Sequence, residues 1–331
     1  MANASGGATS RSIRRSLDVP DLLGRARDGD ARAVARLISL VEDEHPALRD
    51  VMAALAPHTG NAQVLGLTGA PGVGKSTSSN VLVRAYRAKG MRVGVLAVDP
   101  SSPFTGGAIL GDRVRMQDHA TDSGVYIRSM SSRGHLGGLA AATPQAVRVL
   151  EAAGCDVVIV ETVGVGQAEV EVASLADTTL VLLAPGMGDA IQAVKAGILE
   201  IADIFVVNKA DRDGADQTIR DIRGMISLGE RAPGDWRPMI VKTVAARAEG
   251  IDDVIAAVEK HRDWLTQHGE LERRRRSRAA AEIEAVTLAS VRERIGAHHD
   301  GALLESLAGK VVAGALDPYA AADELMRGLE I

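Results

Sequence analysis

The stretch Leu65-Gly-Leu-Thr-Gly-Ala-Pro-Gly-Val-Gly-Lys-Ser-Thr77 decides the fold of this chain. The apolar run from Val64 to Leu67 predicts a short buried strand. Gly69 to Ser76 then fit the pattern G-x-x-x-x-G-K-[ST] at every fixed position, and a helical segment follows from about Lys75. A strand, a glycine-rich loop and a helix in this order are typical of a phosphate-binding loop.

The residue types of this loop suit the phosphates of a nucleotide. Glycines let successive backbone N–H groups point at the phosphates, and the following helix adds the positive end of its dipole. Lys75 would contact the β- and γ-phosphates, and the Ser76 hydroxyl would ligate Mg²⁺. The predicted nucleotide-binding residues of the loop are Gly69, Ala70, Pro71, Gly72, Val73, Gly74, Lys75, Ser76 and Thr77.

Composition bounds the class of protein. The 331 residues allow one large domain with appendages or two domains. Hydrophobic residues make up 46% and aromatic residues only 2%, so the core must be built from Ala, Val, Leu and Ile. A formal net charge of -5 gives no general attraction to nucleic acid or to anionic membranes, and no apolar run is long enough to span a bilayer. We therefore expect neither a nucleic-acid nor a membrane partner.

Cysteine usage and the N-terminus bear on the compartment. Cys155 is the single cysteine, which excludes a disulfide within the chain and a cysteine-rich metal site. This suits the cytoplasm. Met1 to Leu17 is rich in Ser, Ala and Arg without an acidic residue, so a mitochondrial transit peptide is the alternative. We favour a disordered tail, because Gly6-Gly7 would interrupt an amphipathic helix.

The chain between Val64 and Gln267 alternates apolar runs with helical stretches. This alternation predicts a doubly wound α/β domain with a mainly parallel sheet. The expected strands are 64–68, 92–98, 125–129, 156–161, 179–184, 203–207 and 238–243. The expected divisions are a tail at 1–17, an N-terminal helical extension at 18–60, a P-loop domain at 61–267 and a C-terminal helical extension at 268–331. In the N-terminal extension, Asp30 is the predicted N-cap of a helix.

The C-terminal extension predicts three helices with apolar stripes. Leu288, Val291 and Ile295 share a face of the long helix expected at 270–295, and two further helices follow. Such a stripe needs a partner surface, either the main domain or a second subunit, and we expect a homodimer. The arginine run Arg273 to Arg276 is balanced by nearby glutamates and lacks aromatic neighbours, so it predicts a solvated helix face rather than a nucleic-acid site.

A second group of polar residues follows the predicted strand at 203–207. Asn208-Lys-Ala-Asp211 matches the pattern N-K-x-D, in which the Asp carboxylate accepts hydrogen bonds from N1–H and the exocyclic amine of guanine. The aliphatic stem of Lys209 would cover the face of the base. After the strand at 238–243, the backbone N–H of Ala245 or Ala246 would reach the guanine O6. We therefore expect GTP and GDP as ligands rather than ATP.

Acidic side chains at strand ends predict the metal site. Asp99 and Glu161 each end a predicted strand, where they would hold Mg²⁺ directly or through water. Asp112 lies in a glycine-rich loop that would order around the γ-phosphate. The alternatives are helix caps for Asp99 and Glu161 and a surface turn for Asp112. Gln167 in Gly164-Val-Gly-Gln167 is a candidate for positioning the attacking water.

Three longer runs carry a specific resemblance. Val98-Asp-Pro-Ser-Ser-Pro-Phe-Thr-Gly-Gly-Ala-Ile-Leu-Gly-Asp112, Glu161-Thr-Val-Gly-Val-Gly-Gln167 and Pro185-Gly-Met-Gly-Asp-Ala-Ile-Gln-Ala-Val-Lys195 together resemble the MeaB/ArgK family of P-loop GTPases. The likeness extends from about Asp18 to the end of the chain. Ala168 departs from the serine usual in that family after the glutamine.

The resemblance implies a SIMIBI-like GTPase domain, that is, of the signal-recognition-particle and MinD-like class, with helical extensions. It also implies a C-terminal homodimer interface. The Mg²⁺ site would comprise Ser76, Asp99, Asp112 and Glu161, with Lys75, Asp99, Asp112 and Gln167 serving catalysis. Base reading would fall to Asn208, Lys209 and Asp211. The resemblance further implies a partner-sensing switch at Gly186, Asp189 and Lys195.

The function implied by the resemblance is that of a chaperone. GTP hydrolysis, slow without a partner, would gate the loading, protection or reactivation of an adenosylcobalamin-dependent acyl-CoA mutase, the expected one being methylmalonyl-CoA mutase. A cobalamin adenosyltransferase would be a further partner. The alternatives are a metal-insertase GTPase, which would ordinarily need a Cys/His metal relay, and a transport-linked kinase or ATPase. The sequence does not distinguish methylmalonyl-CoA from isobutyryl-CoA mutase.

Overall fold

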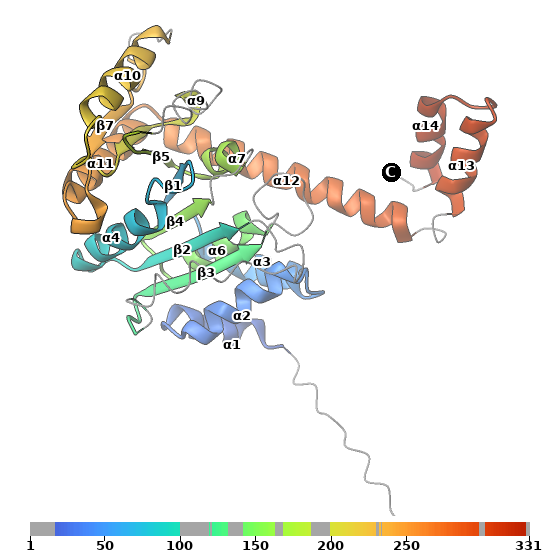
Figure 1. The fold of residues 1–331 in the computed structure, drawn as a ribbon. Helices are drawn as coiled ribbons and strands as arrows, with labels where there is room; N and C mark the ends of the chain where they lie inside the picture. Colours follow the sequence, from blue (N-terminus) through green and yellow to red (C-terminus); the bar gives the residue numbers. More distant parts are fainter. Residues whose placement is uncertain are drawn as a thin grey trace, which may run out of the picture. The chain divides into compact units, whose positions relative to one another are not determined.

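Seven parallel strands form one sheet in the order β3-β2-β4-β1-β5-β6-β7 (Figure 1). The strands are β1 Gln63–Gly69, β2 Val93–Asp99, β3 Val125–Ser131, β4 Val157–Thr162, β5 Thr178–Leu183, β6 Ile204–Val207 and β7 Met239–Lys242. Every residue of β1, β4, β5 and β6 is buried, as expected for parallel strands covered on both faces. All seven predicted strands are confirmed, each within two residues of its expected bounds.

The structure is a computed structural model, and it describes residues 17–99, 119, 121–131, 142–162, 168–186, 199–229, 232, 234–297 and 302–328. Two compact units divide the chain, Met1–Leu265 and Thr266–Ile331, and each is considered by itself. Residues 1–16 of the predicted tail lie outside the described residues. None of the helices in the described ranges is long and apolar enough to cross a membrane.

Helices cover both faces of the sheet within the first unit. On one face, α4 Lys75–Ala88 and α11 Ile251–Gln267 bury apolar side chains against Leu65, Leu67 and Ile159. On the other face, α6 Thr143–Ala152 and α7 Ala168–Leu175 pack near β2 and β4, and α10 Ala215–Leu228 packs on β5 and β6. A short helix, α9 Leu199–Ile201, precedes β6. The sheet is therefore doubly wound, as predicted.

The N-terminal helices belong to the core of this unit. They are α1 Val19–Arg27, α2 Ala31–Glu42 and α3 Leu48–Leu55, with a short 3₁₀ turn η1 Ala56–His58. Asp30 caps α2, as predicted, by accepting hydrogen bonds from the N–H groups of Arg32 and Ala33. The apolar face of α2, including Leu37 and Ile38, is buried with α6 in one cluster. The N-terminal helices thus cover part of one face of the sheet.

Three helices lie within the described residues of the second unit, where three were expected. They are α12 Glu270–Ala297, α13 Ala302–Val312 and α14 Pro318–Gly328. Leu307 of α13 and Ala321 of α14 are buried, and Lys310 pairs with Glu324 at 3.0 Å between these two helices. Arg273, in the arginine run of α12, is 68% exposed and pairs with Glu270, which is consistent with a solvated helix face.

Candidate nucleotide-binding site

The predicted phosphate loop joins the central strand β1 to α4. At two of its glycines a side chain would clash with neighbouring atoms. A side chain at Gly69 would place its Cβ closer than 3.0 Å to the Leu182 carbonyl, and one at Gly74 would do the same to Nδ2 of Asn208. Both glycines have positive φ, +140° and +97°. Only glycine adopts such a conformation at little cost and allows so close an approach. The loop is therefore drawn tightly against the ends of β5 and β6.

The helix α4 begins directly after the phosphate loop. Gly74 is the N-cap, and no described side chain makes a capping hydrogen bond there. The first N–H groups of a helix have no carbonyl partner within the helix, and the helix dipole makes this end positive. The start of α4 therefore suits an anion such as a phosphate.

Lys75 lies across the loop that precedes it. Its Nζ donates hydrogen bonds to the carbonyl oxygens of Gly69, at 2.6 Å, and Ala70, at 3.1 Å, and the residue is buried. These bonds hold the positive charge over the loop at the N-terminus of α4. This is the place where the sequence predicts a contact with the β- and γ-phosphates.

Ser76 and Glu161, two of the predicted Mg²⁺ ligands, meet at the start of α4. The Ser76 hydroxyl donates a 2.7 Å hydrogen bond to Oε1 of Glu161, and both residues are buried. Parallel pairing of β1 with β4 sets Glu161 beside Leu67, near the end of β1. A hydroxyl and a carboxylate are the hard oxygen ligands that Mg²⁺ prefers, so this pair fits the metal.

The other predicted metal and switch residues are only partly described. Asp99 ends β2, and Val98 pairs in register with Thr162 of β4, but the Asp99 side chain lies outside the described residues. Asp112, Gln167, Asp189 and Lys195 also lie outside them, and Gly186 is exposed in the turn after β5. Within the described ranges, no group of three or more His, Cys, Asp and Glu side chains could hold a metal.

Asn208 connects the phosphate loop to the loop after β7. Its Nδ2 donates to the Val73 carbonyl at 2.8 Å, and its Oδ1 accepts from the backbone N–H of Ala245 at 3.0 Å and from the Thr243 hydroxyl at 3.2 Å. The side chain is buried, so each of these bonds lies in a low-dielectric environment. Because the N–H of Ala245 is used here, Ala246 is the remaining predicted donor to guanine O6.

Lys209 and Asp211 follow Asn208 at the edge of the same site. Lys209 has a left-handed backbone with φ of +56°, and its Nζ donates to the Gly72 carbonyl at 2.6 Å. The Asp211 side chain is 39% exposed, and its Oδ2 lies 3.4 Å from Nη1 of Arg247. The structure thus brings Asn208 and Lys209 to the phosphate loop, and Asp211 to Arg247 in the turn after β7.

Three threonines near the site were not predicted from the sequence. Thr243 orients Asn208, as described above. Thr162 donates to Thr68 through their hydroxyls at 3.2 Å, and both are fully buried on adjacent strands. Thr162 follows Glu161 and Thr68 precedes Gly69, but no motif marks either hydroxyl, because their pairing depends on the register of β1 and β4.

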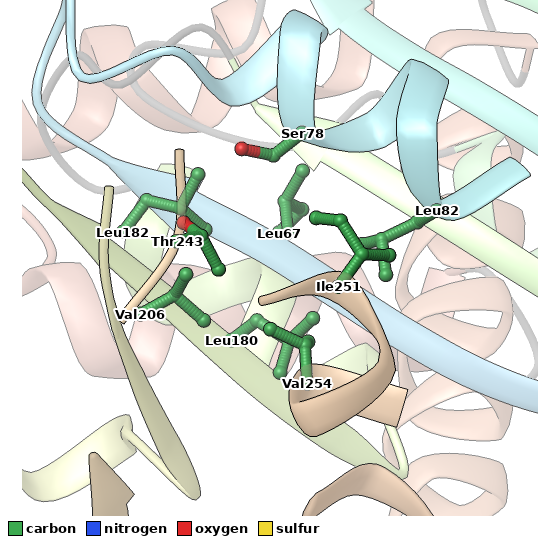
Figure 2. A pocket seen from close by; sticks show the side chains of 9 residues that line it. All are labelled: Leu67, Ser78, Leu82, Leu180, Leu182, Val206, Thr243, Ile251 and Val254. Carbon is green, nitrogen blue, oxygen red and sulfur yellow. The ribbon is translucent and has the colours of Figure 1, made fainter. Parts of the chain in front are cut away.

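A small cavity lies behind the phosphate loop in the core. Figure 2 shows that apolar side chains from β1, β5, β6, α4 and α11 surround it, together with Ser78 and Thr243. Its volume is about 10 Å³, which is close to the space of a single water molecule. A nucleotide does not fit there, so the open surface formed by the loops is the candidate site.

Cys155 does not belong to this site. It lies in the turn before β4, at the opposite end of that strand from Glu161, and is buried. Burial raises the pKa of its thiol to about 12, with a further contribution from Asp156. A protonated, buried thiol is a poor metal ligand, which argues against the metal-insertase alternative.

Comparisons with known proteins identify the family of this chain. The sequence profile of a family described as "Methylmalonyl Co-A mutase-associated GTPase MeaB" matches residues 34–300. A putative GTPase of Pyrococcus abyssi is 46% identical over 312 residues, covering 93% of this chain and 96% of that protein. GTPase ArgK of Escherichia coli is 38% identical over 284 residues, covering 83% and 86%.

A solved structure supports the fold as well as the sequence relationship. The crystal structure of a protein described as LAO/AO transport system kinase matches with a TM-score of 0.71 and 28% sequence identity. The match covers 97% of this chain and 100% of that chain. This match supports the α/β fold described above, a parallel sheet with helical extensions. The chain belongs to the MeaB family of P-loop GTPases, and its reaction is the hydrolysis of GTP.

Proposed function

We propose that this GTPase is a chaperone of an adenosylcobalamin-dependent acyl-CoA mutase, and that its GTP cycle gates the loading, protection or reactivation of that enzyme. The family to which the chain belongs is described by its association with methylmalonyl-CoA mutase. The observation that carries the proposal is this membership together with a site in which Lys75, Ser76 and Glu161 converge on the start of α4.

In this proposal each described residue has a role toward the nucleotide. Lys75 and the N–H groups at the start of α4 bind the phosphates, and Asp211 accepts the hydrogen bonds of guanine. Asn208 holds the phosphate loop and the base-reading loops in one arrangement. Ser76 and Glu161 would hold Mg²⁺ together with Asp99 and Asp112. When bound, the metal neutralises charge on the β- and γ-phosphates.

The partner would read the state of the nucleotide through loops at the same edge of the sheet. Loss of the γ-phosphate releases contacts that order such loops, and a partner protein senses the difference. We assign this sensing to the predicted switch at Gly186, Asp189 and Lys195, and water positioning to Gln167. Hydrolysis is expected to be slow without the partner, because the sequence identifies no built-in arginine finger.

We also propose a homodimer formed through the second unit. Its helices expose large apolar side chains, among them Ile283 at 68%, Val312 at 90% and Tyr319 at 85%. These side chains offer apolar area on all three helices that a second copy of the chain would bury. Sedimentation of the purified protein tests this proposal, which would fail if only monomer were present at micromolar concentration.

The main test is GTP hydrolysis by the purified protein with and without a cobalamin-loaded acyl-CoA mutase. We expect a slow rate with GTP that rises on addition of the mutase, and no comparable rate with ATP. Running methylmalonyl-CoA and isobutyryl-CoA mutases in parallel would identify the partner. A GTPase rate that neither mutase changes would contradict the chaperone function while leaving the GTPase reaction intact.

A second candidate function is a transport-linked kinase. It is favoured by the description of the solved structure with a TM-score of 0.71. A kinase would transfer labelled γ-phosphate to a protein acceptor, such as a substrate-binding protein of a transporter. Labelled acceptor, with labelling competed by ATP and not by GTP, would support this candidate over the chaperone.

A further inference from the structure

Arg247 lies between two carboxylates beside the predicted guanine site. It belongs to the 3₁₀ turn η4, Ala245–Arg247, which follows β7. Its Nε and Nη2 donate to the two carboxylate oxygens of Glu249, at 2.8 Å and 3.3 Å, and its Nη1 lies 3.4 Å from Oδ2 of Asp211. The guanidinium therefore faces the one carboxylate that is expected to read the base.

The backbone around Arg247 is held in one conformation. Val244 and Glu249 form an antiparallel bridge around the turn, and Ala248 within it has a left-handed φ of +56°. Gly250 closes the turn against the Lys242 carbonyl, where a Cβ would come closer than 3.0 Å. A turn fixed in this way limits where the side chain of Arg247 can lie, and the paired bonds to Glu249 restrict it further.

We propose that Arg247 is a positioning residue for base specificity, because it holds the Asp211 carboxylate in the orientation that guanine requires. This inference rests on the proposed guanine contact of Asp211. Guanine needs the carboxylate to lie in the plane of the base, with one oxygen accepting from N1–H and the other from the exocyclic amine. An exposed aspartate is free to rotate, and ordering it on binding costs affinity.

Arg247 and guanine do not compete for the same acceptor capacity. A carboxylate offers about four lone-pair positions, so an arginine at Oδ2 leaves further acceptor positions for the base. Glu249, and to a lesser extent Asp211, raises the pKa of the Arg247 guanidinium, which stays charged throughout. The nearby lysine of the motif, Lys209, points its Nζ to the Gly72 carbonyl instead.

The test compares GDP with IDP, which lacks the exocyclic amine of guanine. Dissociation constants are measured by calorimetry for the wild type, Arg247→Ala, Arg247→Lys and the control Arg220→Ala. Arg220 is an exposed arginine of α10 bonded to Gln217. We expect Arg247→Ala to weaken GDP binding about three- to fivefold, the range of an exposed ion pair, and to weaken IDP binding less.

The ratio of the IDP to the GDP dissociation constant is the decisive quantity. This ratio should be lower in Arg247→Ala than in the wild type. It should be as low in Arg247→Lys, because an ammonium cannot make the paired bonds that fix the guanidinium. It should be unchanged in Arg220→Ala. Equal weakening of both nucleotides, or an unchanged ratio, would overturn the role of Arg247. Equal affinity of the wild type for GDP and IDP would overturn the guanine contact of Asp211 itself, and this inference with it.

Discussion

The Ser76 hydroxyl donates a hydrogen bond of 2.7 Å to Glu161, although 85 residues separate the two along the chain. Side chains alternate between the faces of a strand, so Glu161 points to the face covered by α4, whereas its neighbour Thr162 points to the opposite face. Two adjacent residues of β4 thus contact the two ends of the phosphate loop from opposite faces of the sheet. Glu161 reaches the first turn of α4, and Thr162 reaches Thr68 just before Gly69.

Replacing Glu161 by Gln is expected to weaken the Mg²⁺ dependence of GTP hydrolysis. The amide keeps the shape of the side chain but removes the negative charge that a divalent cation requires. We expect the Mg²⁺ concentration for half-maximal rate to rise about 10- to 100-fold. The matched control is Glu259→Gln, because Glu259 is an exposed residue that pairs with Lys89. A variant with the Mg²⁺ dependence of the wild type would contradict the metal role of Glu161.

Replacing Gly74 by Ala is expected to destabilise the protein more than replacing Gly72 by Ala. Both positions have positive φ, +97° and +79°, so each variant bears a backbone penalty of about 1–2 kcal/mol. Only the Cβ at position 74 would collide with Asn208, whereas that at position 72 has open space. Urea unfolding without added nucleotide measures the difference.

The fluorescence of Trp236 and Trp264 suits this measurement, because both tryptophans belong to the first unit. We expect Gly74→Ala to lose at least about 1 kcal/mol more than Gly72→Ala, as is usual for a steric conflict in a packed site. Equal unfolding midpoints would show that the loop moves away from Asn208 without cost.

The losses of unfolding free energy on replacing Thr68 and Thr162 are expected to be non-additive. Thr68→Val or Thr162→Val alone leaves one buried hydroxyl without its partner, at a cost of about 1–3 kcal/mol. The double variant removes both polar groups while keeping their shape, so its loss should be smaller than the sum of the single losses. Unfolding free energies of the four proteins form the cycle. Simple additivity would mean that the two hydroxyls are energetically independent.

The Cys155 thiol is expected to resist modification in the folded protein. Burial raises its pKa from 9.0 to about 12, so at pH 8 the thiolate fraction is about one in ten thousand. Reaction with a thiol reagent should therefore be at least about a thousandfold slower in the folded than in the urea-unfolded chain. Rapid labelling of the folded protein would contradict the burial of Cys155.

The same pKa shift predicts a dependence of stability on pH. Between about pH 9 and 12 the folded state retains the thiol proton that the unfolded state has lost. The contribution of this group to stability is therefore fully present below about pH 9. That contribution is lost as the pH rises from about 9 toward 12. Replacing Cys155 by Ala should flatten the fall in stability over this range, as measured by unfolding midpoints at several pH values.

The strands could be predicted because each is a run of apolar residues of the length a buried parallel strand requires. Asp30 was predicted as a cap for an equally local reason, since its side chain bonds to N–H groups two and three residues later. The roles of Thr68, Thr162 and Thr243 could not be predicted in this way. Each depends on a partner brought close by strand register or by a loop distant in the sequence.

The sequence by itself determined the parts of this protein that depend on neighbouring residues: the phosphate loop, the N-K-x-D pattern and the alternation of strands and helices. Only the tertiary structure decided how these parts are connected. Asn208 joins the phosphate loop to the loop after β7, and Arg247 meets Asp211. The physical reason is that local conformation follows from short-range sterics and hydrogen bonds, whereas contacts between strand ends follow from the order and register of the whole sheet.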